Sequence, residues 1–427
     1  MNYRIIALLL SLALCFCLFS CGGEVDTDVD DILPVSSDTV TLYVYNWGEY
    51  ISDGSEDSLD SNAEFEKYFN ENLASKYGHK IRVNYSTYSS NEDMYAKVSS
   101  GAVAYDVIIP SDYMIERMIK EGLLRKLNFD NIPNSEYIED EFRNLEYDPT
   151  NEYSIPYSYG MVGIIYNTAI VSEDDPDIGS WDLMFNPESA YKGDILQFNN
   201  SRDAFGTALY KLGLDVNDTT RANWEAALEL LKRQKSIVQG YVMDEIYNKM
   251  ESGSAAIAAY YAGDYLTMYE DNEDLEFFYP SEGTNYYIDA FCVPYNSKNP
   301  ALAEEYINFM LSEEPAVANA EYTYYASPNR LVVESEEYRE YLSEIKDNAY
   351  DILYNGIADG YCISAYRNLD DDGLQMMNDL WEELKVESPV STTIFVICGI
   401  IIAAITAFAV GFAIRRKKRA IVPLERT

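Results

Sequence analysis

Histidine is nearly missing from this 427-residue sequence, which contains only His79. A Ser-His-Asp triad and a histidine-rich zinc site both need imidazole groups, so neither kind of site is expected. His79 lies in the polar run Lys76–Lys80, which we expect to be an exposed loop between a helix and a strand. Phosphate binding is also unsupported, because none of the loops that follow the expected strands is glycine-rich with a basic residue.

Positive charge is scarce, with 31 Lys and Arg against 72 Asp and Glu and a net charge of −41. Residues 1–20 and 391–427 hold seven of the basic side chains and one acid, so the rest of the chain carries −47. Such a surface repels nucleic acid, whose phosphates require Lys and Arg. The acidity is equally consistent with the solubility of an exported protein and with attraction of a cationic ligand.

Cysteine is confined mainly to the two ends of the chain. Only Cys292 and Cys362 fall in the part expected to fold, and Cys292 lies in an apolar run, so we expect it to be a buried free thiol. A disulfide between these two residues stays open, because sequence alone does not give the pairing.

The N-terminus predicts export and anchoring. Arg4 and the apolar run Ile5–Leu18 are typical of a signal peptide over residues 1–20. The segment Leu18-Phe19-Ser20-Cys21-Gly22 resembles a bacterial lipoprotein cleavage box, which implies that Cys21 becomes the lipidated first residue; the alternative is an uncleaved signal anchor. The acidic residues 22–38 predict a flexible tether.

The C-terminus predicts a transmembrane helix. Ile394–Ile414 is 21 residues without a charge, enough to span the roughly 30 Å hydrocarbon core of a bilayer. The basic run Arg415–Arg419 follows directly, so the positive-inside rule places residues 415–427 in the cytoplasm. Everything before the helix is then extracytoplasmic, periplasmic or at the cell surface, and attached to the cell membrane.

Strands and helices alternate between these ends. We expect strands at residues 39–45, 81–85 and 106–110, helices at 61–77 and 91–100, and further helices over 335–388. This alternation predicts an α/β fold with a mostly parallel sheet. Ligands bind beyond the carboxyl ends of such strands, which points to the loops at 47–50, 111–113, 199–203 and 261–264.

The candidate loops combine aromatic rings with the acids Glu49, Asp112, Asp203 and Asp264. A further acid, Asp289, interrupts an apolar strand, where a charge is costly unless a buried arginine or a ligand cation pairs with it. An ammonium group gains roughly 0.5–2 kcal/mol over an aromatic face and about 4 kcal/mol beside a carboxylate at an effective dielectric near 20. Carboxylates set along aromatic walls are what an ammonium-bearing ligand such as a polyamine needs.

Seven ordered segments carry a resemblance to a known family. They are residues 42–51, 85–88, 91–97, 105–113, 153–157, 180–181 and 326–329. In these segments the chain resembles the bacterial spermidine/putrescine-binding proteins of ABC importers, within extracellular solute-binding protein family 1. The resemblance implies a type II periplasmic-binding-protein fold, in which two lobes close on a ligand in the interlobe cleft. Lobe 1 would comprise residues 39–157 and 288–332, and lobe 2 residues 158–287 and 333–388.

The same resemblance implies a binding protein, not an enzyme, with no cofactor or metal and with the permease and ATPase on separate chains. The expected ligand-binding residues are Trp47, Gly48, Glu49, Tyr50, Ser111, Tyr113, Asp203, Tyr261, Asp264, Tyr287, Asp289 and Tyr325.

The chain also departs from the family pattern. Asn200 replaces an acid of the spermidine-type pattern, Tyr261 and Tyr287 replace tryptophans, and a late glutamine has no clear counterpart near Tyr366. Asp264 and Glu49 match acids of the putrescine-preferring relatives. The pattern leans slightly towards putrescine, with spermidine still open.

Three alternatives remain. The adjacent Tyr324 and Tyr325 offer hard oxygen ligands for ferric iron. A ligand-sensing module would signal through the membrane helix, although the cytoplasmic tail is short and basic. Paired carboxylates would suit acid–base catalysis, but no nucleophile–base pair accompanies them. Asp289 and Trp47 favour the amine.

Overall fold

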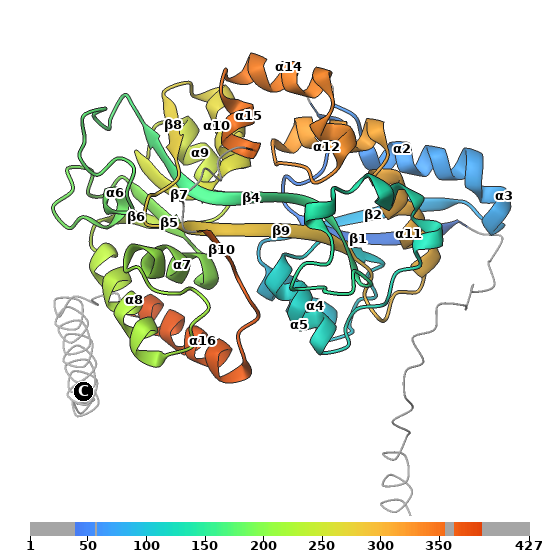
Figure 1. Ribbon diagram of the computed structural model, residues 1–427, viewed down its shortest axis with the longest axis horizontal. Helices are drawn as coiled ribbons and strands as arrows, with labels where there is room; N and C mark the ends of the chain where they lie inside the picture. The colour runs from blue at the N-terminus through green and yellow to red at the C-terminus, as the bar shows by residue number, and fades with distance from the viewer. Residues whose placement is uncertain (1–38, 56–57, 355–362, 387–427) are drawn as a thin grey trace, which may run out of the picture. The chain divides into compact units, whose positions relative to one another are not determined.

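The computed structural model describes residues 39–55, 58–354 and 363–386, which form two compact units (Figure 1). Unit 1 contains residues 39–159, 288–323 and 327–340, and unit 2 contains residues 160–287, 324–326 and 341–386. Two strands, β4 (Ser154–Asn167) and β9 (Thr284–Cys292), each begin in one unit and end in the other. Both units are therefore assembled from separate stretches of the chain.

The first two predicted lobe boundaries, after residues 157 and 287, lie within two residues of the observed ones. The third differs, because unit 1 continues to Glu340 instead of ending at 332, and unit 2 takes Tyr324–Ala326. Hydrogen bonds explain the exchange: the Tyr324 hydroxyl pairs with that of Tyr341, and the Tyr325 hydroxyl donates to Asp264. These partners are far apart in the sequence, so no local pattern marks the boundary.

The sheet of unit 1 has the order β2 (Ile81–Tyr88), β1 (Val40–Trp47), β3 (Val107–Ile108) and the end of β9. β1 runs parallel to β2, with Val40 opposite Ile81, and parallel to β3. β9 is antiparallel to β3 at Cys292. The helices are α2 (Ser61–Tyr68), α3 (Ala74–Tyr77), α4 (Asn91–Ser99), α5 (Asp112–Lys120), α11 (Pro300–Met310), α12 (Glu313–Thr323) and α13 (Arg330–Val333). Short 3-10 helices cover Phe129–Asn131, Pro133–Tyr137 and Asp140–Phe142.

The predicted helix at 61–77 is a continuous helical run with a π-helical turn at Phe69–Leu73. Asp60 caps its first turn through the amide of Ala63 at 2.9 Å. Gly78 ends the run with φ of +74°, a left-handed conformation that glycine adopts without strain. Phe65 and Phe69 are fully buried, and Phe65 packs edge-on against Tyr306 of α11.

The exposed position predicted for His79 is wrong. Its side chain is buried, with 6% of its surface exposed, and its ring lies near the rings of Phe69 and Tyr77. Its Nδ1 lies 2.9 Å from the carbonyl oxygen of Tyr77. The polar neighbours suggested a loop, but the aromatic residues of the preceding helical run cover the ring.

The sheet of unit 2 has the order β4, β7 (Ile257–Tyr261), β5 (Ile195–Phe198) and β6 (Val238–Val242). β5 is parallel to both β6 and β7, whereas β4 is antiparallel to β7 and to β8 (Leu275–Phe278). β10 (Ile363–Ala365) pairs in parallel with the start of β9. The prediction of parallel strands is thus confirmed for the centre of each unit, with antiparallel pairs beside them.

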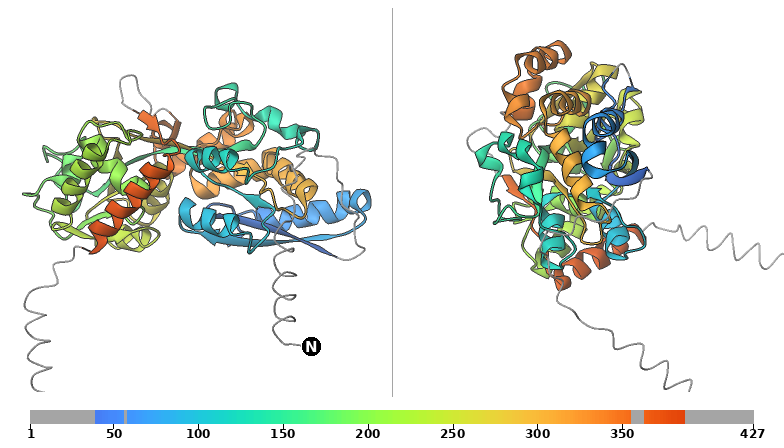
Figure 2. Two further views of the ribbon diagram at one scale, coloured as in Figure 1. Left: turned by 90° about the horizontal axis from the view of Figure 1, so that it is seen from below. Right: turned by 90° about the vertical axis from the view of Figure 1, so that its right-hand side faces the viewer.

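The helices of unit 2 are α6 (Asp182–Phe185), α7 (Ser201–Lys211), α8 (Arg221–Gln234), α9 (Ile246–Glu251), α10 (Ala262–Asp271), α15 (Ala349–Tyr354) and α16 (Asp371–Val386); α14 (Glu336–Ile345) spans the boundary. α7, α8 and α16 pack together, and α9 and α10 pack on the other side of the strands (Figure 1, Figure 2). The ring of Phe205 lies near those of Trp224 and Trp381 in this core.

None of the helices within the described residues is long and apolar enough to cross a membrane. The predicted signal peptide, Cys21, the tether, the helix at Ile394–Ile414 and the basic tail at 415–427 all lie outside the described residues, as does Cys362. These remain predictions. Cys292 is a buried free thiol, as expected, and burial raises its pKa.

Candidate functional site

Two predicted acids occupy equivalent places in unit 2. β5 ends at Phe198 and leads into α7, which carries Asp203 in its first turn; β7 ends at Tyr261 and leads into α10, which carries Asp264 in its first turn. β5 and β7 are parallel neighbours, so both acids lie at the same edge of the sheet. The predicted loops are therefore helix starts, where the helix dipole favours a negative charge.

Asp203 is 6% exposed, and its Oδ2 accepts hydrogen bonds from Asn200 Nδ2 and the Tyr261 hydroxyl, both at 2.8 Å. The Tyr366 hydroxyl is also hydrogen-bonded to this carboxylate. Asn200 additionally caps α7 through the amide of Arg202 at 2.9 Å. Asn200, which replaces an acid of the spermidine-type pattern, thus orients the neighbouring carboxylate.

Asp264 is 7% exposed, and each of its oxygens accepts one tyrosine hydroxyl. Tyr247 donates to Oδ1 and Tyr325 donates to Oδ2. Burial raises the pKa of Asp264 from its ordinary 3.8 to about 6, because desolvation outweighs the two hydrogen bonds that favour the ionised form. Near neutral pH this carboxylate is therefore mostly ionised, and a nearby positive charge would lower its pKa.

Three predicted tyrosines form a row beside these acids. The ring centroids of Tyr261 and Tyr287 are 5.3 Å apart, and those of Tyr287 and Tyr325 are 6.3 Å apart. Two glycines make space for the row: a Cβ at Gly160 would lie 2.6 Å from the Tyr287 hydroxyl, and one at Gly263 would lie 2.8 Å from the Tyr325 ring. Unit 2 thus combines two buried carboxylates with an aromatic wall.

Unit 1 holds a third buried carboxylate, Asp289, which is 4% exposed. Its Oδ2 accepts a hydrogen bond from the Tyr50 hydroxyl at 2.7 Å, and that hydroxyl is also hydrogen-bonded to Ser158. Ser111 lies opposite Asp289 in an isolated β-bridge. The structure therefore brings together the predicted Tyr50, Ser111 and Asp289.

Trp47 is half-buried at the end of β1. Its indole N–H donates to the carbonyl of Ile109 at 3.0 Å, and its ring lies 4.7 Å from that of Tyr88. Gly48 is also half-buried, whereas Glu49 is exposed in the turn with φ of +48° and has no hydrogen bond or ion pair among the described residues. Glu49 thus stands apart from the buried acids.

Asn91 organises the remaining predicted residues of unit 1. Its Nδ2 donates to the Ser111 hydroxyl at 3.0 Å and to the Tyr113 hydroxyl at 3.2 Å. Tyr113 in turn donates to Glu92 at 3.0 Å. Asp112 is buried and accepts the backbone amide of Tyr113 at 2.7 Å, so it shapes the start of α5.

Four residues form hydrogen bonds with the predicted acids or with other predicted site residues, yet the sequence did not single them out. They are Asn91, Ser158, Tyr247 and Tyr366. Tyr247 and Tyr366 are two of 39 tyrosines, so their type alone carried no signal. Asn91 had a weak signal, because it is the first residue of the predicted helix at 91–100 and of the segment 91–97 that resembles the family. Their roles depend on partners that are distant in the sequence.

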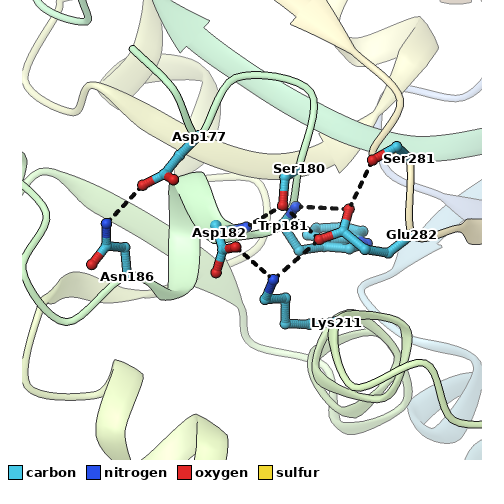
Figure 3. Close-up of polar contacts among 8 residues, drawn as sticks. All are labelled: Asp177, Ser180, Trp181, Asp182, Asn186, Lys211, Ser281 and Glu282. Atoms are coloured by element: carbon cyan, nitrogen blue, oxygen red, sulfur yellow. Dashed lines mark hydrogen bonds and ion pairs between the residues drawn. The ribbon is translucent and has the colours of Figure 1, made fainter.

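A separate polar cluster in unit 2 has a structural role (Figure 3). Lys211 Nζ lies 2.8 Å from Asp182 and 3.2 Å from Glu282, while the fully buried Trp181 donates its indole N–H to Gly283. Burial opposes ionisation of Glu282, but hydrogen bonds from Ser180, the backbone and Lys211 outweigh it and lower its pKa. This cluster joins the end of α7 to the turn before β9.

The geometry disfavours an iron site at Tyr324 and Tyr325. The Tyr324 hydroxyl pairs with Tyr341 at 2.8 Å, whereas the Tyr325 hydroxyl donates to Asp264. Within the part of the chain that the structure describes, no three His, Cys, Asp or Glu side chains gather as metal ligands would.

Residues 63–343 match the family model described as bacterial extracellular solute-binding protein. The spermidine/putrescine-binding periplasmic protein of Salmonella typhimurium is 34% identical over 295 residues, covering 69% of this chain and 79% of the relative. The putrescine-binding periplasmic protein of Escherichia coli is 26% identical over 324 residues, covering 72% and 83%.

A solved structure from Listeria monocytogenes, assigned in its description to a spermidine/putrescine ABC transporter, is also similar. Its TM-score is 0.70 at 34% identity, and the match covers 81% of this chain and 99% of that one.

Proposed function

Because this chain belongs to the bacterial extracellular solute-binding proteins, we propose that it captures polyamines outside the cell for an ABC importer. It has the α/β periplasmic-binding-protein fold of its structural neighbours. Putrescine and spermidine are the proposed ligands, since the relatives described above carry those names. The closed, ligand-bound form would deliver the amine to a permease that, like the ATPase, is a separate chain.

The observation that carries this proposal is the chemistry around the buried carboxylates. Asp203, Asp264 and Asp289 are each at most 7% exposed, and each accepts a hydrogen bond from a tyrosine hydroxyl. Tyrosine is a neutral donor, so these contacts hold the carboxylates in place without cancelling their charge. A polyamine supplies the complement, with ammonium groups for the acids and methylenes for the tyrosine rings.

The proposed ligand contacts divide between the two units. In unit 1 they are Tyr50, Asp289, Ser111, Tyr113 and Trp47, and in unit 2 they are Asp203, Tyr261, Asp264, Tyr287 and Tyr325. Gly48 and Glu49 belong to the proposed set through the family resemblance alone. Asp264 supports a preference for putrescine, because the putrescine-preferring relatives have an acid at the matching position.

The chain would also be anchored in the membrane. The lipoprotein-type segment ending at Cys21 and the apolar run Ile394–Ile414 support one anchor at each end of the chain, with the region between them outside the cytoplasm. Residues 415–427 would then be a short basic tail in the cytoplasm.

Isothermal calorimetry tests the ligand. The full-length chain in a non-ionic detergent is titrated with putrescine, spermidine and ferric citrate at near-physiological salt, beside Asp289→Asn and Asp264→Asn. We expect micromolar or tighter binding of at least one amine, weakened at least about tenfold by Asp289→Asn, since a charged hydrogen bond contributes about 1.5–3 kcal/mol. Silence with both amines would overturn the proposal, and heat with ferric citrate alone would identify iron as the cargo.

A further inference from the structure

Tyr247 is the one donor to Asp264 that neither the sequence patterns nor the proposed ligand contacts include. It lies near the start of α9, which packs against α10, and its hydroxyl donates to Asp264 Oδ1. We propose that Tyr247 is a positioning residue whose hydroxyl holds Asp264 in its ionised form and thereby sets the pH range over which the chain binds a diamine. This inference rests on the proposed function.

The placement of Tyr247 is specific. Its ring stands edge-on to that of Tyr260 on β7, with centroids 6.5 Å apart. The Asp264 bond is the only hydrogen bond of its hydroxyl among the described residues. The opposite oxygen of Asp264 is held by Tyr325, so the two hydroxyls fix the carboxylate from both sides.

The electrostatic surroundings give these hydroxyls their effect. Desolvation and the negative charge of Asp244 both disfavour ionisation of Asp264, and only the hydrogen bonds oppose them. On the elements packed against α10 and directly beside them, the basic groups are Lys249 of α9, which bonds to Gln239, and Lys346, which lies over the Tyr269 ring of α10 and pairs with Glu276. The other titratable groups on those elements are neutral or acidic. They are Tyr247 and Glu251 of α9, Tyr260 and Tyr261 of β7, Glu276 of β8, and Tyr350, Asp351 and Tyr354 of α15.

The pH dependence follows from this arrangement. A hydrogen bond to the charged form of a carboxylate lowers its pKa, so losing one donor raises the pKa of Asp264 above about 6. A ligand ammonium pairs with the ionised carboxylate, and binding therefore weakens as the pH falls through that pKa. Removing the Tyr247 hydroxyl moves the weakening to higher pH and leaves binding at alkaline pH intact.

The same unit offers a matched control in Tyr241 of β6. Its hydroxyl is buried and has no hydrogen-bond partner among the residues that the structure describes, and its ring packs edge-on against Trp381. Tyr241→Phe removes the same atom as Tyr247→Phe from another buried site, without touching Asp264. Any effect that merely reflects loss of a buried hydroxyl will appear in both variants.

The test is calorimetric titration with putrescine at pH 5, 6, 7 and 8, on the full-length chain in non-ionic detergent and on both variants. A rise of about one unit in the pKa of Asp264 makes Tyr247→Phe roughly fivefold weaker than the parent at pH 6 and within about twofold at pH 8. Tyr241→Phe should follow the parent throughout. Circular dichroism confirms that each variant is folded.

Two results would overturn the inference while leaving the proposed function intact. One is a Tyr247→Phe profile that coincides with Tyr241→Phe at every pH, and the other is a loss of affinity that is equal at pH 6 and pH 8. Failure of the parent chain to bind putrescine or spermidine at any pH would instead overturn the proposed function, and this inference with it.

Discussion

Replacing Asp264 by asparagine should change how the stability of unit 2 depends on pH, even without a ligand. In the folded chain burial raises the pKa of Asp264 to about 6, against 3.8 for the exposed group. Above pH 6 the folded state therefore holds a carboxylate that would be more stable in water. As the pH falls through 6 the folded chain binds a proton that the unfolded chain does not, and the parent gains stability relative to the variant until about pH 3.8.

The magnitude follows from the size of the shift. A rise of about two pKa units, at 1.36 kcal/mol each, corresponds to about 3 kcal/mol between the fully ionised and fully protonated limits. Most of this roughly 3 kcal/mol of stability is gained by the parent between pH 8 and pH 4. The free energy of unfolding of Asp264→Asn minus that of the parent should therefore be about 2–3 kcal/mol more positive at pH 8 than at pH 4.

Urea unfolding followed by tryptophan fluorescence measures this difference. Three of the four tryptophans, Trp181, Trp224 and Trp381, belong to unit 2, so the signal comes mainly from the unit that contains Asp264. Both proteins share every other acid, and the pH dependence of those acids cancels in the comparison. A difference that stays constant from pH 8 to pH 4, or that changes in the opposite direction, would refute the burial argument.

Three other substitutions test the geometry of the two units. Gly160→Ala should destabilise the chain by about 1–3 kcal/mol in urea, because its Cβ would meet the Tyr287 hydroxyl at 2.6 Å. As a control, Gly240→Ala should not, because its Cβ would meet no described atom within 4 Å, and equal effects of the two would contradict this. Glu49→Gln should change the putrescine Kd by less than about threefold, since an exposed carboxylate such as Glu49 contributes little even where it contacts the ligand; a tenfold loss by calorimetry would show that the ligand buries Glu49. Glu282→Gln should cost about 1.5 kcal/mol at pH 7. Because the pKa of Glu282 is lowered, that cost should vanish as the pH falls through it; an undiminished cost at pH 3 would show that charge is not involved.

Local patterns predicted the elements well where periodicity and burial agree. The opening strand was expected at 39–45 and spans Val40–Trp47, and the expected helix at 91–100 is α4 at Asn91–Ser99. Apolar alternation and helical spacing act between near neighbours, which a single sequence displays directly. The same patterns missed the helix starts that carry Asp203 and Asp264. In both places a strand leads almost directly into a helix, and the short junction was interpreted as a loop.

The partners of the buried acids lay beyond such reasoning. Asp264 is bonded by tyrosines 17 positions before it and 61 positions after it. Asp289 is bonded by Tyr50, which is 239 positions earlier. Tyrosine is so common here that its type gave no guidance, and only the folded chain shows which hydroxyls meet which carboxylates.

Each unit is discontinuous in sequence, and this fixes when each can finish folding during synthesis. Unit 1 lacks the β9 residue that pairs with β3, and the Tyr306 ring that packs on Phe65, until the ribosome has passed α11. Unit 2 lacks the Trp381 ring near Phe205 until α16 emerges, at the very end of the described chain. The core of unit 1 can therefore be completed only late in synthesis, and the core of unit 2 later still, which suits the export predicted by the N-terminal segment.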